Sequence, residues 1–254
     1  MRIRNGILLF CFLLLQGCAS FFEDLRRTPE TAAQSPPVQT DRPAENSAVS
    51  LFAPRVTAEK ALGWLKNGNT RFVNGHLRND GQSKADRQRT FAAQKPHSIV
   101  LSCSDSNAPP EIIFDQKLGE IYVIRTSAHT VDDAVVASLE YAVAHLGPQN
   151  LVVMGHTYCG PIESALENVS DHHHLSPLLS ELSRTILPNL KSSSALTPAA
   201  GYRNEAWAHV RGVIAEIQTR SALLSERIQA GQLQINPALY DTETGLVEFQ
   251  SLNR

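Results

Sequence analysis

The sequence predicts an α/β fold in which helices flank a central, mostly parallel β-sheet. Three short apolar runs carry this prediction, at residues 98–101, 121–124 and 151–154. Each run is continuously hydrophobic rather than alternating, which is typical of strands that are covered on both faces. Helical patterns separate the runs, and strands that alternate with helices generally form a parallel sheet.

The first expected helix begins near Thr57, whose hydroxyl is a suitable N-cap, and carries Glu59 in its first turn. A second helix is capped by Asp132 and runs to about Leu146, where Gly147 and the following proline end it. Further helices are expected from about residue 161, over 178–187 and, as one long helix, over 203–230. Short strands are expected at 232–235, 239–240 and 246–249.

Composition limits the kind of protein that this chain can be. It has 254 residues, is 42% hydrophobic and carries a formal net charge of −2. These values are typical of one substantial globular domain with some additional sequence. Basic residues form no long block, so nothing in the sequence predicts nucleic-acid binding.

The N-terminus has the pattern of an export signal. Arg2 and Arg4 precede a short apolar run over residues 7–15, and small residues follow. Cys18 lies where the apolar run ends, in a segment that resembles a bacterial lipobox, so residues 1–18 are interpreted as a lipoprotein-type signal peptide with Cys18 as the lipidated residue. An ordinary signal peptide with an incidental cysteine is the alternative.

The segment after Cys18 predicts how the domain would be attached. Residues 19–56 are rich in Pro, Ser, Thr and Gln and are interpreted as a flexible linker before a domain over 57–254. Lipid chains would anchor the protein to a membrane. By resemblance to Gram-negative lipoproteins, Ala19 favours the outer membrane, facing the periplasm of the cell envelope.

Removal of the signal peptide and lipidation of Cys18 leave Cys103 and Cys159 as the thiols of the domain. In an oxidising compartment a disulfide between them is one interpretation. His156, three residues before Cys159, favours another, because two thiolates and an imidazole supply three zinc ligands and leave one tetrahedral position free. Cys103 and His156 both follow predicted strands, and ligands bind at the carboxyl ends of parallel strands.

Several motifs make the chain resemble a β-class carbonic anhydrase. They are Gly68-Asn69-Thr70-Arg71-Phe72, Cys103-Ser104-Asp105-Ser106, Pro109-Pro110-Glu111, the segment from Gly155 to Gly160, and the segment from Tyr240 to Val247. The resemblance covers roughly residues 57–250. It implies the β-carbonic anhydrase fold and the reversible hydration of carbon dioxide to bicarbonate and a proton.

The resemblance also implies roles for individual residues. One Zn²⁺ per subunit is expected on Cys103, His156 and Cys159, with water or the catalytic Asp105 in the fourth position. Substrate-binding positions carry over to Gln94, Tyr122, Tyr141 and Gly160; for the two tyrosines, core packing is an equally good interpretation. A homodimer or larger homo-oligomer is implied as well.

The chain departs from the family pattern at two places. Asn107 stands where the family has an arginine that pairs with the aspartate and holds it off the metal, and Ser127-Ala128-His129 replaces Ala-Gly-Asn. An asparagine offers one neutral amide in place of a charged, bidentate fork. A zinc-binding but catalytically impaired protein is therefore an alternative, and a hydrolase of a CO2-like molecule is a third. His129 itself is interpreted as solvated or hydrogen-bonded rather than as a ligand.

Overall fold

The computed structural model describes residues 56–167, 176–191 and 196–252. The predicted signal peptide, Cys18 and, apart from Val56, the predicted linker lie outside these ranges. Among the helices described, none is both long and apolar enough to cross a membrane.

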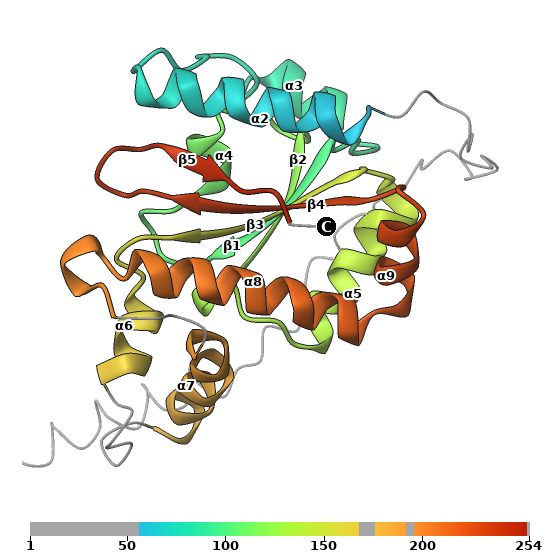
Figure 1. Ribbon diagram of the computed structural model, residues 1–254. Helices are drawn as coiled ribbons and strands as arrows, with labels where there is room; N and C mark the ends of the chain where they lie inside the picture. The colour runs from blue at the N-terminus through green and yellow to red at the C-terminus, as the bar shows by residue number, and fades with distance from the viewer. Residues whose placement is uncertain (1–55, 168–175, 192–195, 253–254) are drawn as a thin grey trace, which may run out of the picture. The chain divides into compact units, whose positions relative to one another are not determined.

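A five-stranded sheet forms the centre of the domain (Figure 1), with the strand order β2-β1-β3-β4-β5. Neighbouring strands are parallel except for β5, which is antiparallel to β4. This confirms the predicted mostly parallel sheet. The strands are β1 (Ser98–Cys103), β2 (Ile121–Thr126), β3 (Asn150–His156), β4 (Gln234–Tyr240) and β5 (Val247–Phe249).

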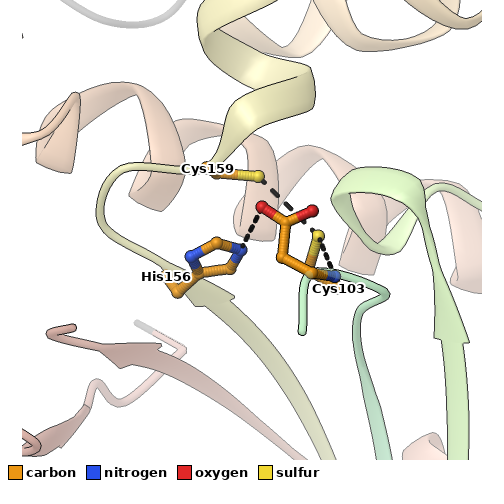
Figure 2. A group of neighbouring side chains, drawn as sticks. Cys103, His156 and Cys159 are labelled. Atoms are coloured by element: carbon orange, nitrogen blue, oxygen red, sulfur yellow. Dashed lines mark hydrogen bonds and ion pairs between the residues drawn. The ribbon is translucent and has the colours of Figure 1, made fainter. Parts of the chain in front are cut away.

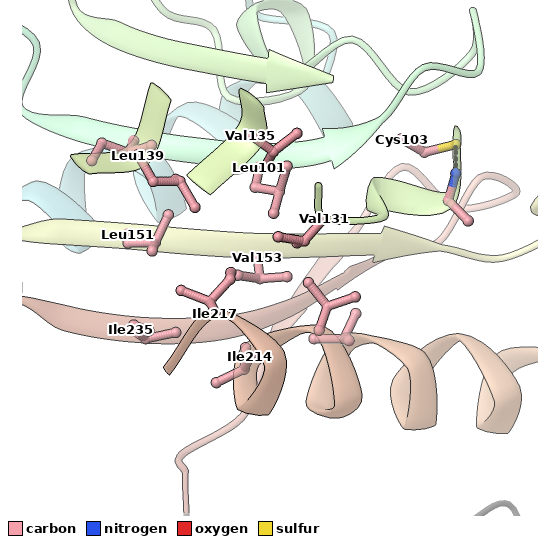
Figure 3. Packing of buried hydrophobic residues seen from close by; sticks show 14 of the residues in the cluster. Leu101, Cys103, Val131, Val135, Leu139, Leu151, Val153, Ile214, Ile217 and Ile235 are labelled. Carbon is pink, nitrogen blue, oxygen red and sulfur yellow. Dashed lines mark hydrogen bonds between the residues drawn. The ribbon is translucent and has the colours of Figure 1, made fainter. Parts of the chain in front are cut away.

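Helices cover both faces of the sheet (Figure 1). One face packs against α2 (Ala58–Val73) and α4 (Pro110–Ile113). The short helix α3 (Lys84–Thr90) lies between these two helices in the chain. The other face forms the larger core, part of which Figure 3 shows between the strands and α8. Its helices are α5 (Asp133–Tyr141), α6 (Gly160–Glu167), α7 (Pro177–Leu190), α8 (Arg203–Arg220) and α9 (Ala222–Gln229).

Burial on both faces explains the continuous apolar runs. Every residue of β1 and of β3 is buried. Ile99 and Leu101 belong to the larger core, whereas Val100, between them, belongs to the smaller one. Because successive side chains point to opposite faces of a strand, a strand covered on both sides needs apolar residues at consecutive positions.

The expected helix caps are present. The Thr57 hydroxyl accepts a hydrogen bond from the backbone N–H of Lys60 at 3.3 Å. The Asp132 carboxylate accepts one from the N–H of Val135 at 2.8 Å. The helix that Asp132 caps continues through a π-helical turn over Ala142–Leu146 and ends at Gly147, whose φ is 75°.

The α2 helix is joined to the end of the sheet by the first family motif. A Cβ at Gly68 would lie 1.7 Å from the carbonyl oxygen of Phe114, so only glycine permits this approach of α2 to α4. The Asn69 amide donates to the carbonyl of Gly245 at 2.9 Å and accepts from the N–H of Val247 at 2.9 Å. The motif therefore serves packing of the fold.

Two sequence predictions about the C-terminal part were wrong. The single helix expected over 203–230 is two helices, because Ser221 is extended (φ −121°, ψ 107°) and its hydroxyl accepts from the N–H of Leu224, which caps a new helix. The strands expected at 232–235 and 239–240 are one strand, β4. Pro237, which lies between the two expected strands, is part of β4 and directly precedes Ala238, the first residue paired with β5.

Candidate metal centre

The carboxyl ends of β1 and β3 bring together four side chains that could bind a metal ion. Cys103 is the last residue of β1 and His156 the last of β3, while Cys159 immediately precedes α6. Figure 2 shows these three side chains converging. With Asp105 they form a group whose potential ligand atoms all lie within 4.8 Å of one another.

The two cysteines are free thiols rather than a disulfide. Their sulfur atoms lie 3.9 Å apart, far beyond the roughly 2.05 Å length of an S–S bond. Both side chains are buried. The structure therefore favours the metal-site interpretation of this pair over the disulfide interpretation.

His156 presents one nitrogen to the group. Its Nδ1 lies 2.9 Å from the carbonyl oxygen of Thr157, an acceptor, so Nδ1 carries the proton and donates it. Nε2 is left with a free lone pair, makes no hydrogen bond within the described part of the chain, and lies 3.5 Å from an Asp105 oxygen. A buried nitrogen without a hydrogen-bond partner is costly unless a ligand satisfies it.

The loop that directly follows His156 is hydrogen-bonded to the end of β4. The N–H of Thr157 donates to the carbonyl of Tyr240 at 3.0 Å, and the N–H of Thr242 donates to the Thr157 hydroxyl at 3.0 Å. The Arg203 guanidinium, in turn, lies 3.0 Å from the Asp241 carboxylate. These contacts fix the backbone from which the imidazole projects.

The group also concentrates negative charge. Hydrogen bonding from the Cys159 thiol, together with His156 nearby, outweighs burial and lowers the pKa of Cys103, whereas the bond to Cys103 and burial raise the pKa of Cys159. Burial opposes charging of His156, but the Cys103 thiolate raises the pKa of the imidazole overall. Burial, then the Cys103 charge, raises the pKa of Asp105. Anionic groups forced together in this way are stabilised by a cation.

Among the residues that the structure describes, no arginine or lysine is bonded to the Asp105 carboxylate. One carboxylate oxygen accepts a hydrogen bond from the N–H of Gly160 at 3.2 Å. Asn107 is exposed. Arg125, the nearby cation, donates instead to the backbone carbonyl oxygens of Cys103 and Asp105. Nothing in the described ranges therefore replaces the arginine that the family pattern places at position 107.

The predicted substrate-binding residues have different positions. Gly160 lies at the centre, as expected, because its N–H contacts Asp105. Tyr122 packs against the larger core. It pairs with Ile99, which lies four residues before Cys103, so Tyr122 is displaced from Cys103 by roughly 13 Å along the strand direction. Gln94 and Tyr141 are exposed, and no hydrogen bond links either to the four-residue group across the ranges described. The substrate-binding roles of Gln94, Tyr122, Tyr141 and Gly160 stay predictions.

The turn Ser127–His129 contributes a contact that the sequence did not reveal. The backbone N–H of Ala128 donates to the Cys103 sulfur at 3.3 Å. His129 is fully buried, and neither ring nitrogen has a hydrogen-bond partner among the residues that the structure describes, so its interpretation as solvated or hydrogen-bonded was wrong. The departure from Ala-Gly-Asn was the signal that this turn is unusual.

Comparison with known proteins agrees with this geometry. The carbonic anhydrase family model matches residues 98–247. Carbonic anhydrase 2 of Mycobacterium tuberculosis is 36% identical over 192 residues, which cover 75% of this chain and 90% of that protein. The chain belongs to the carbonic anhydrase family. A carbonic anhydrase of Mycolicibacterium smegmatis is 33% identical over 77% of this chain and 93% of its own length.

Solved structures place the chain in the β class of the carbonic anhydrases by its fold. The β-carbonic anhydrase CcaA superposes with a TM-score of 0.61 at 22% identity and covers 75% of this chain and 95% of its own. One of two tetrameric β-carbonic anhydrases from Sordaria macrospora gives a TM-score of 0.57 at 21% identity, over 75% and 93% of the two chains. The β-carbonic anhydrase fold expected from the sequence is confirmed.

The residues at the centre fit zinc by their chemistry. Two thiols, one imidazole nitrogen with a free lone pair and one carboxylate oxygen form a four-member donor set. Zinc prefers cysteine and histidine ligands in tetrahedral geometry and also accepts carboxylate oxygen. A hard, oxygen-seeking cation such as Mg²⁺ or Ca²⁺ would not select this set.

Proposed function

We propose that this β-carbonic anhydrase uses one zinc ion per chain to catalyse the reversible hydration of carbon dioxide to bicarbonate and a proton, which makes it a lyase. The observation that carries the proposal is the buried His156 Nε2, which has no hydrogen bond within the described ranges and faces two thiols and a carboxylate. When bound, zinc supplies Lewis acidity that makes hydroxide available from water near neutral pH.

Each residue of the centre has a distinct task in this proposal. Cys103, His156 and Cys159 would hold the metal from three directions, and two thiolates would moderate its Lewis acidity. Asp105, held by the N–H of Gly160, would accept a hydrogen bond from the reacting water and so orient it.

A second candidate is a zinc-binding protein in which hydration is impaired. Asp105 Oδ2 lies 3.5 Å from His156 Nε2, the atom that would bind metal, and no arginine of the described ranges is bonded to the carboxylate. A carboxylate that can approach a cation from this position competes with water for the fourth ligand site. Asn107 is thus the residue on which the two candidates differ.

Stopped-flow measurement of CO2 hydration by zinc-loaded protein, from pH 6 to pH 9.5, tests the proposal. A hydration rate well above that of the Cys159→Ser variant, at any pH in this range, supports the enzyme. Zinc binding without such a rate at alkaline pH would favour the impaired protein. Absence of zinc binding would remove both candidates.

The cellular setting is a separate part of the proposal. We infer a lipid anchor at Cys18, a linker over 19–56 and a location at the cell envelope, facing the periplasm from the outer membrane; the export signal in the sequence supports these inferences. Expression of the full chain with a radiolabelled fatty acid tests them. Label in the wild-type chain but not in Cys18→Ser is expected, and an unlabelled wild-type chain would overturn the anchor.

We also propose a homodimer or larger homo-oligomer. The Sordaria macrospora structures are described as tetrameric, and Tyr141, one of the predicted pocket residues, is 49% exposed in the single chain. A partner subunit would bring Gln94, Tyr122 and Tyr141 into a pocket that a single chain does not complete. Sedimentation velocity tests this part, and a monomer at micromolar concentration would contradict it.

A further inference from the structure

His209, a fully buried residue of α8, contacts the turn that hydrogen-bonds Cys103. Its Nε2 lies 2.8 Å from the carbonyl oxygen of Ala128. The N–H of the same residue, Ala128, donates to the Cys103 sulfur at 3.3 Å. One residue of the turn therefore joins a histidine side chain to a proposed zinc ligand.

The direction of these hydrogen bonds follows from the Ala128 carbonyl, which can only accept, and Asn189 on α7 supplies the matching donor. The Asn189 amide nitrogen lies 3.2 Å from His209 Nδ1, and an amide nitrogen can only donate. Nδ1 is therefore the acceptor, and Nε2 carries the proton that it donates to Ala128. Burial lowers the pKa of His209 to about 4, which keeps the ring neutral. Gly212 makes room for the asparagine, because a Cβ there would lie 2.2 Å from Asn189 Cγ.

The turn needs such support because its backbone is strained. Ala128 has φ 50° and His129 has φ 47°, and neither is glycine. This left-handed conformation costs a non-glycine residue roughly 1 kcal/mol and persists only where the surroundings impose it. Without the hydrogen bond to its carbonyl, Ala128 can relax its strained φ and ψ, and its N–H, which lies on the preceding peptide plane, can then move away from the sulfur.

We propose that His209, oriented by Asn189, is a positioning residue that holds the Ala128 N–H on the Cys103 sulfur and thereby limits how much charge Cys103 donates to zinc. This inference rests on the proposed zinc centre. Hydrogen bonds to thiolate ligands tune the metal that the thiolate binds. In a centre with two thiolates, the bond to Cys103 would recover part of the Lewis acidity that thiolate ligands remove.

The test uses the full chain loaded with Co²⁺, whose thiolate-to-metal charge-transfer band reports electron donation by sulfur directly. The variants are His209→Leu, which removes both ring hydrogen bonds, and His209→Gln, whose amide can still donate to Ala128. The matched control is His97→Leu, because His97 is also buried with both ring nitrogens bonded but lies at the opposite end of β1. The pH profile of CO2 hydration by the zinc-loaded forms is the second measurement.

In His209→Leu the charge-transfer band is expected to move to longer wavelength. The pH midpoint of hydration should rise by roughly one unit, the effect of one hydrogen bond to a charged group. His209→Gln should restore much of both shifts, and His97→Leu should show neither. Asn189→Ala, which frees the His209 tautomer, should move the band in the same direction by a smaller amount.

A band that is unchanged in both His209→Leu and Asn189→Ala would overturn the proposal, as would an equal shift in His97→Leu. The spectra separate this failure from failure of the proposed function. If the chain binds Co²⁺ through its thiolates but hydrates no CO2, the proposed function is refuted, and the band shift still tests the role of His209. If no thiolate-to-cobalt band is seen, both the proposed function and the role of His209 are refuted.

Discussion

Polar side chains are buried at both ends of β1, β3 and β4, but the two ends differ in whether these side chains are hydrogen-bonded to one another. At the amino end a hydrogen-bonded chain crosses the strands and pairs each group with the next, with distances of 2.7 to 3.1 Å. At the carboxyl end, the buried nitrogen that faces the centre has no hydrogen bond in the described part of the chain. The buried members of the amino-end chain are Asn236, Asn150, Ser98 and His97; the exposed Gln234 and the half-buried Gln116 form its two ends.

The difference teaches how a structural polar cluster can be distinguished from a functional one. The amino-end chain has one consistent direction, since the Asn150 amide donates to the Ser98 hydroxyl, which can then donate to His97. Such a network satisfies itself and needs nothing from outside. The carboxyl-end group collects thiols, an imidazole and a carboxylate whose charges only a cation balances. We therefore infer that the polar side chains at the amino end stabilise the fold, and that those at the carboxyl end form the functional site.

The largest effect is expected at the carboxyl end. Cys159→Ser should reduce bound zinc from about one ion per chain to a small fraction and reduce CO2 hydration to background, because one of three strong ligands is lost. Metal analysis and stopped-flow assays measure these changes, and circular dichroism checks the fold. Retention of full zinc occupancy and activity by a folded variant would break the assignment.

The opposite result is expected at the amino end. Asn150→Ala removes the acceptor of the Asn236 amide and the amide that donates to the Ser98 hydroxyl, and should lower the free energy of unfolding by about 2–4 kcal/mol. Urea titration measures this loss. Since the residue lies at the far end of β3 from His156, kcat/KM of the folded fraction should stay within about twofold of wild type. A large loss of kcat/KM with unchanged stability would reverse the roles of the two ends.

A smaller effect is expected where the carboxyl end departs from its family. In Asn107→Arg, a charged hydrogen bond to Asp105 should replace at most a neutral one and raise the hydration rate at neutral pH roughly five- to tenfold. Asn107→Gln is the matched control, because it lengthens the side chain without adding charge, and should change the rate little. If Asn107→Arg leaves the rate unchanged, Asp105 is already positioned and the impaired candidate fails.

The smallest effect concerns acid stability. Burial lowers the pKa of His97, although its bond to Gln116 opposes this, so the folded chain binds a proton there less readily than the unfolded chain. The stabilisation is fully present above the unfolded pKa, about 6.5, and is lost as pH falls through the lowered folded value. In urea titrations of zinc-loaded protein, the decline below pH 6.5 should therefore be shallower in His97→Gln than in wild type. An identical decline in both would show that His97 contributes nothing to it.

The sequence predicted the fold class and the meeting of the candidate metal ligands at one edge of the sheet, for a physical reason. Strands covered on both faces leave continuous apolar runs, and Cys103 and His156 each end such a run, so their meeting at one edge follows from parallel topology. The disagreement between one long C-terminal helix and the observed pair arose at Ser221, where the extended backbone depends on a tertiary contact of its hydroxyl with Glu140. Local sequence contains no record of that contact.

The contacts around the ligands could not be predicted for a related reason. The hydrogen bond from Ala128 to Cys103 involves a backbone N–H, which any residue type supplies, and its geometry depends on a left-handed φ at an alanine. His209 lies 106 residues after Cys103 and reaches it only through that turn. Such positioning groups have no spacing pattern, because the packing of α8 against the sheet places them.

X-ray absorption at the zinc edge tests the central claim most directly. The account predicts two sulfur ligands at about 2.3 Å and nitrogen or oxygen ligands at about 2.0–2.1 Å. Loss of one sulfur is expected in Cys159→Ser loaded with excess zinc. A spectrum of the wild-type protein without sulfur ligands, or a purified chain that binds no zinc, would contradict the assignment of the carboxyl end of the sheet as the catalytic centre.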